Sequence, residues 1–192
     1  KVNKIIKTNK LLFYICLITA IIIYCSPVYY DQILTSFPVN YFTIFIFAIS
    51  SSYAICKYVI IFPSQTIIIA SSLTLIAIVS LTIYAYFIKQ EFSLLNGNIF
   101  MGSMISVIGG IISFVLKLKI GKSVVMLLCI FSFCSYLIYD TQLILGNKRM
   151  EYKTDDYALA AISLYFDIAR IFVALLRIIY KVIAEEDDKN QI

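Results

Sequence analysis

The chain has 192 residues, of which 61% are hydrophobic and 14% are charged, and its formal net charge is +5. Soluble domains contain about 45–50% apolar residues, and a chain of this length cannot bury such an excess in one water-soluble core. The composition therefore excludes an ordinary soluble domain. Most basic residues stand in short connectors between apolar runs and form no patch with interleaved aromatics, so we expect a lipid bilayer and no nucleic acid as partner.

Six continuous apolar runs approach the roughly 20 residues that a helix needs to cross the hydrocarbon layer. In chain order they cover residues 11–29, 41–62, 66–88, 99–118, 123–145 and 157–183. We expect Ser26-Pro27 to end or kink the first run and Pro63 to stop the second. Apolar and polar residues do not alternate in these runs as they do in the strands of a membrane β-barrel. They predict an all-α integral membrane protein, a bundle of about six transmembrane helices that forms one domain over 1–183. An acidic, soluble and disordered tail is expected over 184–192.

Small residues indicate how these helices pack. Gly102, Ser106 and Gly110 recur every four positions in the fourth run, which predicts a close helix–helix contact. The chain has no His, and its five cysteines all lie inside apolar runs without a CxxC pair. We interpret the cysteines as packing residues, and neither a zinc site nor a disulfide framework is expected.

Ionisable residues inside apolar runs are expensive and are commonly functional. Lys57 stands five residues before the end of the second run, where its long side chain can reach the interface. Asp140 stands late in the fifth run and continues a polar stripe formed by Cys129, Ser132 and Tyr136. The stripe fits the wall of a hydrated cavity, and a position of Asp140 at headgroup level is the alternative.

Asp167 stands ten residues into the last run, near mid-membrane. Arg170 follows three residues later and shares its helix face, so the two can form an ion pair. Arg177 falls at nearly the same angle two turns further on. The alternative is a buried ion pair that only holds helices together, although removing two charges from water costs free energy.

The two membrane aspartates can meet if the fifth and sixth helices pack together. Two adjacent carboxylates cannot both ionise cheaply, so Asp140 and Asp167 can hold one shared proton. This predicts a pH-operated latch, closed while the proton bridges the pair and loosened when both groups ionise and repel. Carboxylate oxygens also suit Ca²⁺. We therefore expect Asp140 and Asp167 to contact Ca²⁺ transiently as a permeating ion, with no resident cofactor.

Three segments resemble the C-terminal signature of the transmembrane Bax-inhibitor-motif family, and its Lifeguard branch in particular. They are YDTQLILGNK at 139–148, DDY at 155–157 and LYFDI at 164–168. The likeness extends upstream through FPVNY at 37–41 and EFS at 91–93, and it covers about residues 10–183.

The resemblance implies seven transmembrane helices with a central C-terminal helix, residues 11–29 standing in the place of the second. It implies a non-enzymatic, pH-sensitive Ca²⁺ leak that modulates intracellular Ca²⁺ and suppresses cell death. The expected location is the endoplasmic reticulum, Golgi or another endomembrane rather than the plasma membrane, with apoptosis-regulating membrane proteins as partners. The family's paired aspartates correspond to Asp140 and Asp167.

Two positions depart from the family pattern. In many relatives a basic residue in this helix lies opposite the paired aspartates, but residues 11–29 contain none. Arg170, one helical turn after Asp167, can take its place. Serines occupy 50–52, where some relatives carry a Glu. The pH response of this chain is therefore expected to differ from that of its relatives.

Two other classes of protein compete with this interpretation. An intramembrane aspartyl protease also uses two membrane aspartates, which suits acid–base hydrolysis. Asp140 follows a Tyr as that class requires, but Asp167 is preceded by LYF and not by the expected Gly-x-Gly. A non-conducting membrane scaffold that regulates apoptosis through protein partners is the second alternative, and no residue excludes it.

Overall fold

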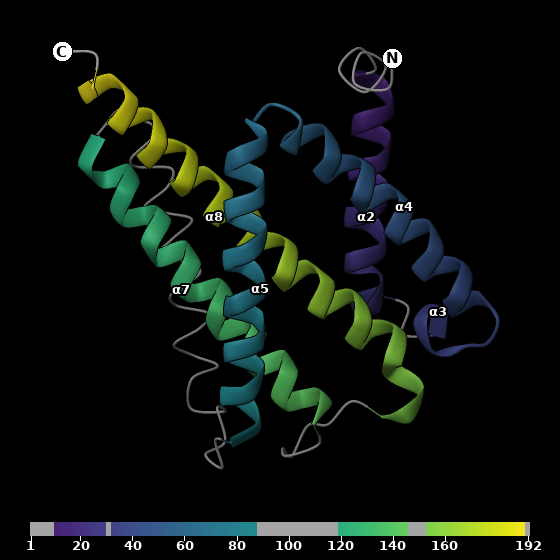
Figure 1. Ribbon diagram of the computed structural model, residues 1–192. Helices are drawn as coiled ribbons and strands as arrows, with labels where there is room; N and C mark the ends of the chain where they lie inside the picture. Colours follow the sequence, from purple (N-terminus) through teal and green to yellow (C-terminus); the bar gives the residue numbers. More distant parts are fainter. Residues whose placement is uncertain (1–9, 30–31, 88–118, 146–152, 191–192) are drawn as a thin grey trace. The chain divides into compact units, whose positions relative to one another are not determined.

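A computed structural model describes residues 10–29, 32–87, 119–145 and 153–190, and every regular element in these ranges is helical. The all-α prediction is confirmed for them. The predicted fourth run, 99–118, with Gly102, Ser106 and Gly110, lies outside the described residues. The elements in Figure 1 are α2 (Lys10–Tyr29), α3 (Gln32–Thr35), α4 (Val39–Val59), α5 (Ser64–Phe87), α7 (Lys119–Ile144), the 3-10 helix η1 (Thr154–Asp156) and α8 (Tyr157–Asn190).

Four of these helices are long and apolar enough to cross a membrane. Their apolar parts match four of the six predicted runs, and a count of six is not confirmed. The helix α2 is apolar over a shorter stretch, Lys10–Ser26, and does not qualify. The four candidate spans are Val39–Val59, Ser64–Phe87, Val125–Ile144 and Tyr157–Ala184.

Outward-facing side chains on the spans are large and apolar. Phe42 in α4, Leu75 in α5 and Phe131 in α7 are 68%, 64% and 70% exposed. Surfaces of this kind are costly in water but match the acyl chains of a bilayer. The exposed faces therefore fit lipid as their solvent.

Exposed hydroxyl groups on the same helices do not need water as a partner. The side chains of Thr43, Ser72 and Ser80 each donate a hydrogen bond to the carbonyl oxygen four residues earlier, at 2.7–3.0 Å. A polar group in hydrocarbon must be satisfied within the protein. These bonds let three polar side chains face lipid.

The chain divides into two compact units: Lys1–Ile67 with Tyr152–Tyr165, and Ile68–Glu151 with Phe166–Ile192. In the first unit, α2 contacts α3 and α4, and α3 also contacts α4 and η1. The ring of Phe47 packs edge to face on Tyr165, with centroids 5.4 Å apart, and so joins α4 to the first residues of α8. In the second unit, α7 and the later part of α8 run side by side (Figure 1).

One helix end agrees with the sequence prediction and one differs from it. The helix α2 ends at Tyr29, the end of the predicted run, and Pro27 lies inside its last turn. Proline has no N–H for the carbonyl of Ile23, and the Ser26 hydroxyl donates to that oxygen at 2.7 Å instead. The predicted disorder of the tail is wrong for residues 185–190, which continue α8 as a helix; no Pro or Gly interrupts the chain there.

Candidate functional site

The two predicted aspartates come together in the second unit. Asp167 of α8 is buried, with a side chain only 4% exposed. The side chain of Asp140, which is half-buried on α7, lies within hydrogen-bonding reach of Asp167. A hydrogen bond between two carboxyl groups requires a proton on one of them. The geometry thus fits a pair that holds one proton.

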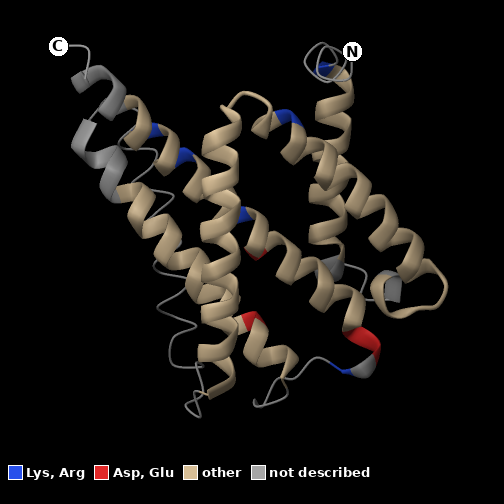
Figure 2. Cartoon of the chain, in the orientation of Figure 1, with Lys and Arg blue, Asp and Glu red and all other residues tan. Residues whose placement is uncertain are grey.

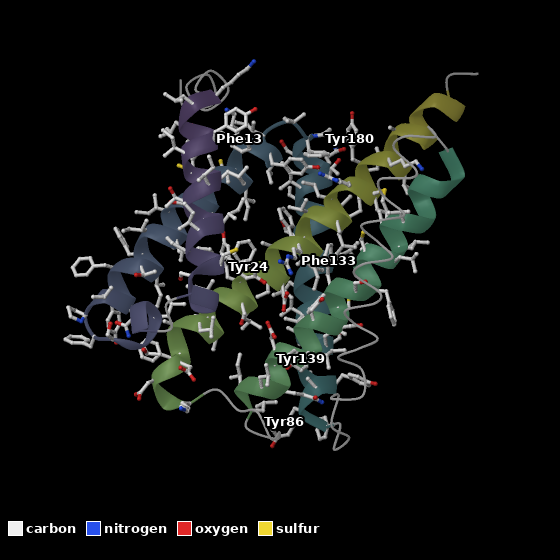
Figure 3. All side chains as sticks on the ribbon, turned by 180° about the vertical axis from the view of Figure 1, so that it is seen from behind. Phe13, Tyr24, Tyr86, Phe133, Tyr139 and Tyr180 are labelled. Atoms are coloured by element: carbon white, nitrogen blue, oxygen red, sulfur yellow. The ribbon has the colours of Figure 1, made fainter. Side chains whose placement is uncertain are left out.

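Arg170 supplies a positive charge next to this pair. Its Nη1 atom lies 3.7 Å from Oδ1 of Asp167, one turn away on the same helix. The guanidinium also lies over two aromatic rings, 5.5 Å from the centroid of Phe166 and 6.0 Å from that of Phe133. Figure 3 shows Phe133 on α7, so the second ring connects Arg170 to the neighbouring helix. Ion pair and ring contacts together hold the cation between α7 and α8.

The remaining predicted site residues lie along the same two helices. Ser132 is buried, and its hydroxyl donates to the carbonyl oxygen of Leu128 at 2.9 Å, so this group is satisfied within α7. Tyr136 is half-buried, and Arg177 is exposed. The interpretation of the stripe as the wall of a hydrated cavity stays a prediction.

Sequence reasoning did not single out Gln142, which lies two residues beyond Asp140. Gln142 is 2% exposed, and its Oε1 atom has no hydrogen-bond partner among the described residues. The Oδ2 atom of Asp167 is also buried and also has no hydrogen-bond partner among the described residues. Buried acceptors without partners are costly, and in a polar site such atoms can accept from water or contact a cation. A Gln inside an apolar run was the signal available in the sequence.

A second polar contact, also missed, lies in the first unit. Asn40, 1% exposed, donates through Nδ2 to the hydroxyl of Tyr157, and its Oδ1 accepts from the backbone N–H of Tyr41 at 2.9 Å. The rings of Tyr41 and Tyr157 also pack, with centroids 5.9 Å apart. Both motif segments, FPVNY and DDY, therefore meet here and tie the start of α4 to the start of α8.

The other ionisable and thiol groups singled out in the sequence have local contacts. The Nζ atom of Lys57, near the end of α4, lies 4.9 Å from the ring centroid of Phe13. That this side chain reaches the interface stays a prediction. All five cysteines are free thiols, of which Cys25 and Cys56 are exposed.

The donor set gives no closed metal site in the part of the chain that the structure describes. No three His, Cys, Asp or Glu side chains gather there into a group that could hold a metal ion. Ca²⁺ takes about 6–8 oxygen ligands, so two carboxylates supply a fraction of a shell. The transient contact of Asp140 and Asp167 with Ca²⁺ stays a prediction.

Four membrane-length apolar helices, with lipid-compatible outer faces and a buried aspartate on one of them, define a multi-pass α-helical integral membrane protein. The family described as inhibitor of apoptosis-promoting Bax1 matches residues 2–182. The chain belongs to this family.

Curated relatives support the assignment and its Lifeguard branch. Protein LIFEGUARD 4 of Arabidopsis thaliana is 31% identical over 171 residues, which cover 87% of this chain and 66% of the relative. Golgi anti-apoptotic protein of vaccinia virus (strain Lister) is 28% identical over 74% of this chain and 58% of its own length. Protein lifeguard 4 of Mus musculus is 29% identical over 73% of this chain and 57% of its own length. The chain thus spans about two thirds or less of these relatives, and no solved structure matches it.

Proposed function

We propose that this protein forms a pH-sensitive Ca²⁺ leak across an endomembrane and thereby lowers the tendency of the cell to die. The observation that carries the proposal is the contact between Asp140 and Asp167, which brings two carboxyl groups together on two apolar helices. A soluble enzyme would place such a pair in a cleft. Here the pair lies within membrane-length helices, where an ionisable group marks an ion or proton pathway by default.

The latch follows from the charges of the described residues. Within Val125–Ile144 of α7, Asp140 is the one charged residue, and α5 carries none over Ser64–Phe87. Two carboxyl groups and Arg170 therefore determine the net charge around the site. With one shared proton, the site holds one negative and one positive charge and stays closed. Loss of that proton leaves two carboxylates that repel each other, and their oxygens then face a passing cation.

The names of two relatives support the location and the cellular role. The vaccinia virus relative is described as a Golgi anti-apoptotic protein, and the family description concerns inhibition of apoptosis. An endomembrane with a steep Ca²⁺ gradient is a place where a leak has consequences. We propose no enzymatic step, and no catalytic residue is assigned.

Ca²⁺ flux into liposomes tests the proposal directly. Purified full-length protein is reconstituted into vesicles that contain a Ca²⁺ dye, and uptake is compared with protein-free vesicles and with D140N. We expect uptake well above the protein-free rate for the parent and a clear loss for D140N. An uptake equal to that of empty vesicles at every pH, with folding confirmed by circular dichroism, would overturn the proposal.

A non-conducting scaffold is the alternative function. It is favoured by the relative's description, which states an anti-apoptotic role and mentions no transport. The scaffold predicts no flux, and it also predicts that D140N retains full protection of cells against an apoptotic stimulus. A leak gated by the pair predicts loss of protection in the same variant.

A further inference from the structure

Three exposed aromatic rings meet where α4 and α8 begin. Phe37, Tyr41 and Tyr157, together named the three-ring cluster, are 79%, 56% and 41% exposed. The rings of Phe37 and Tyr41 are nearly perpendicular, at 83°, and their centroids are 5.8 Å apart. The ring of Tyr157 is tilted by 48° to that of Tyr41, with centroids 5.9 Å apart. All three residues belong to the first compact unit, so they form one continuous aromatic surface that is open to the surroundings.

A buried amide holds the two tyrosines of the cluster in place. Asn40 donates through Nδ2 to the Tyr157 hydroxyl and accepts through Oδ1 from the backbone N–H of Tyr41. The Phe37 ring packs in turn against Tyr41. Rings that are already ordered lose little conformational entropy when a ligand binds to them. The three-ring cluster is therefore preorganised, unlike a single exposed aromatic side chain.

The cluster lies at headgroup depth. The candidate span of α4, Val39–Val59, has 21 residues, which at 1.5 Å per residue is about 31 Å, close to the hydrocarbon thickness of about 30 Å. Phe37 precedes this span, Tyr41 stands near its start, and Tyr157 is the first residue of the span of α8. The three rings therefore lie at one boundary of the hydrocarbon layer, where tyrosine is favoured.

The charge next to the cluster is net negative. Lys153, Asp155 and Asp156 directly precede Tyr157, at η1, and Figure 2 shows the acidic residues in red at the start of α8. Oδ2 of Asp156 accepts a hydrogen bond from the backbone N–H of Lys153 at 2.9 Å. Neither carboxylate forms an ion pair with a residue that the structure describes. The electrostatic field at the rings therefore favours a cation over an anion.

A quaternary ammonium group matches these features best. Aromatic faces attract cations through the ring quadrupole, and clustered rings are well suited to choline-type groups. A metal ion would need several oxygen ligands, whereas the cluster supplies only two tyrosine hydroxyls, one of which already contacts Asn40. At headgroup depth, the molecules that carry a quaternary ammonium group are phospholipids with a choline headgroup.

We propose that the three-ring cluster binds the choline headgroup of a membrane phospholipid. The quaternary ammonium group lies against the rings of Phe37, Tyr41 and Tyr157. The acyl chains of the same lipid follow the exposed apolar face of α4, on which Phe42 and Phe45 lie. The site uses none of the residues of the aspartate pair, so it does not depend on the proposed leak.

Native mass spectrometry measures the expected lipid preference. The full chain in maltoside micelles is mixed with equal amounts of phosphatidylcholine and phosphatidylethanolamine that carry the same acyl chains, and the two singly bound forms are compared. These lipids have the same net charge and differ in the methyl groups on nitrogen. We expect the parent to favour phosphatidylcholine and F37L/Y41L to lose at least about half of that preference, because two of the three rings are gone. F37Y/Y41F keeps three rings and should keep the preference.

A second aromatic pair provides the matched control. Tyr86 and Phe87 at the end of α5 are also exposed, with rings at 86° and centroids 5.4 Å apart, but a basic residue, Lys89, follows them in the sequence. Y86L/F87L should keep the parental preference. Equal binding of phosphatidylethanolamine by all variants shows that the lipid-facing surface is intact.

Free phosphocholine distinguishes a lipid site from a site for soluble choline compounds. At the concentration of the lipid it should not displace phosphatidylcholine, because it lacks the acyl chains. An unchanged phosphatidylcholine preference in F37L/Y41L, an equal loss in Y86L/F87L, or displacement by free phosphocholine would overturn the proposal.

Discussion

Arg170 supplies the positive charge next to the aspartate pair. It lies 3.7 Å from Asp167 and is held by the rings of Phe133 and Phe166. A positive charge this close favours the ionised form of a carboxyl group, so in the proposed latch it makes the shared proton easier to lose. In this chain the cation comes from α8 itself, so the balance depends on how α7 and α8 pack.

Replacement of Arg170 by Gln should therefore shift the pH response of the leak. Without the guanidinium, the pair holds its proton to higher pH, and the midpoint of the flux–pH curve should move upward by about one unit or more. The measurement is the liposome flux assay from pH 5.5 to pH 9. R170K keeps the charge and should stay nearer to the parent. An unchanged midpoint in R170Q would show that Arg170 does not act on the pair.

Tyr157 gives a stability prediction at the same scale. In Y157F the Nδ2 group of buried Asn40 loses its acceptor, which should cost about 1–3 kcal/mol of unfolding free energy. Tyr86 is 64% exposed, so Y86F is a matched control that should change stability by less than about 0.5 kcal/mol. The test is equilibrium unfolding in detergent micelles. Equal stabilities for the two variants would contradict the assigned contact.

Residue contacts were predictable from the sequence only where few candidates existed. Asp140 and Asp167 could be paired because charged residues are rare in the apolar runs and the two runs follow each other in the chain. Asn40 and Tyr157 are 117 positions apart, and many polar residues could have met either one. The ring of Phe133 beside Arg170 was hidden for the same reason, since aromatic residues are abundant.

Helices are the scale at which the sequence is most informative. Hydropathy located four spans to within a few residues, because about 20 apolar residues in succession have few other stable conformations in a membrane. The helix α2 ends at Tyr29, where the predicted run ends, and the Ser26 hydroxyl donates to the Ile23 carbonyl that Pro27 cannot reach with an N–H. The end of α8 was harder to predict, because the helix continues through an acidic segment that was expected to be disordered.

The two sides of α7 should respond differently to the same substitution. Leu137 is 0% exposed and Leu127 is 63% exposed. L137A removes packing inside the second unit and should cost about 2 kcal/mol or more, whereas L127A exchanges one lipid contact for another. Unfolding free energies in the same detergent compare the two. A cost for L127A as large as for L137A would mean that the outward face of α7 is covered by protein rather than lipid.

For the whole molecule, the sequence predicted the class, the family and the all-helical fold. Family membership came from short polar motifs that composition cannot supply, and the match over residues 2–182 confirms it. A bundle of six or seven helices and a central C-terminal helix stay predictions, because helix order along a chain does not determine which helices surround which. Function at this scale depends on whether the chain conducts, and on whether the aspartate pair controls conduction.

The pH dependence of Ca²⁺ flux tests that control most directly. Parent, D140N, D167N and the double variant are measured from pH 6 to pH 8, with D155N, a change at an exposed residue, as the matched control. We predict that parental and D155N flux rises with pH as the shared proton leaves. Each single variant should lose this dependence, and the double variant should lose no more, because the two groups act as one unit. Single variants that keep the parental pH profile would contradict the account.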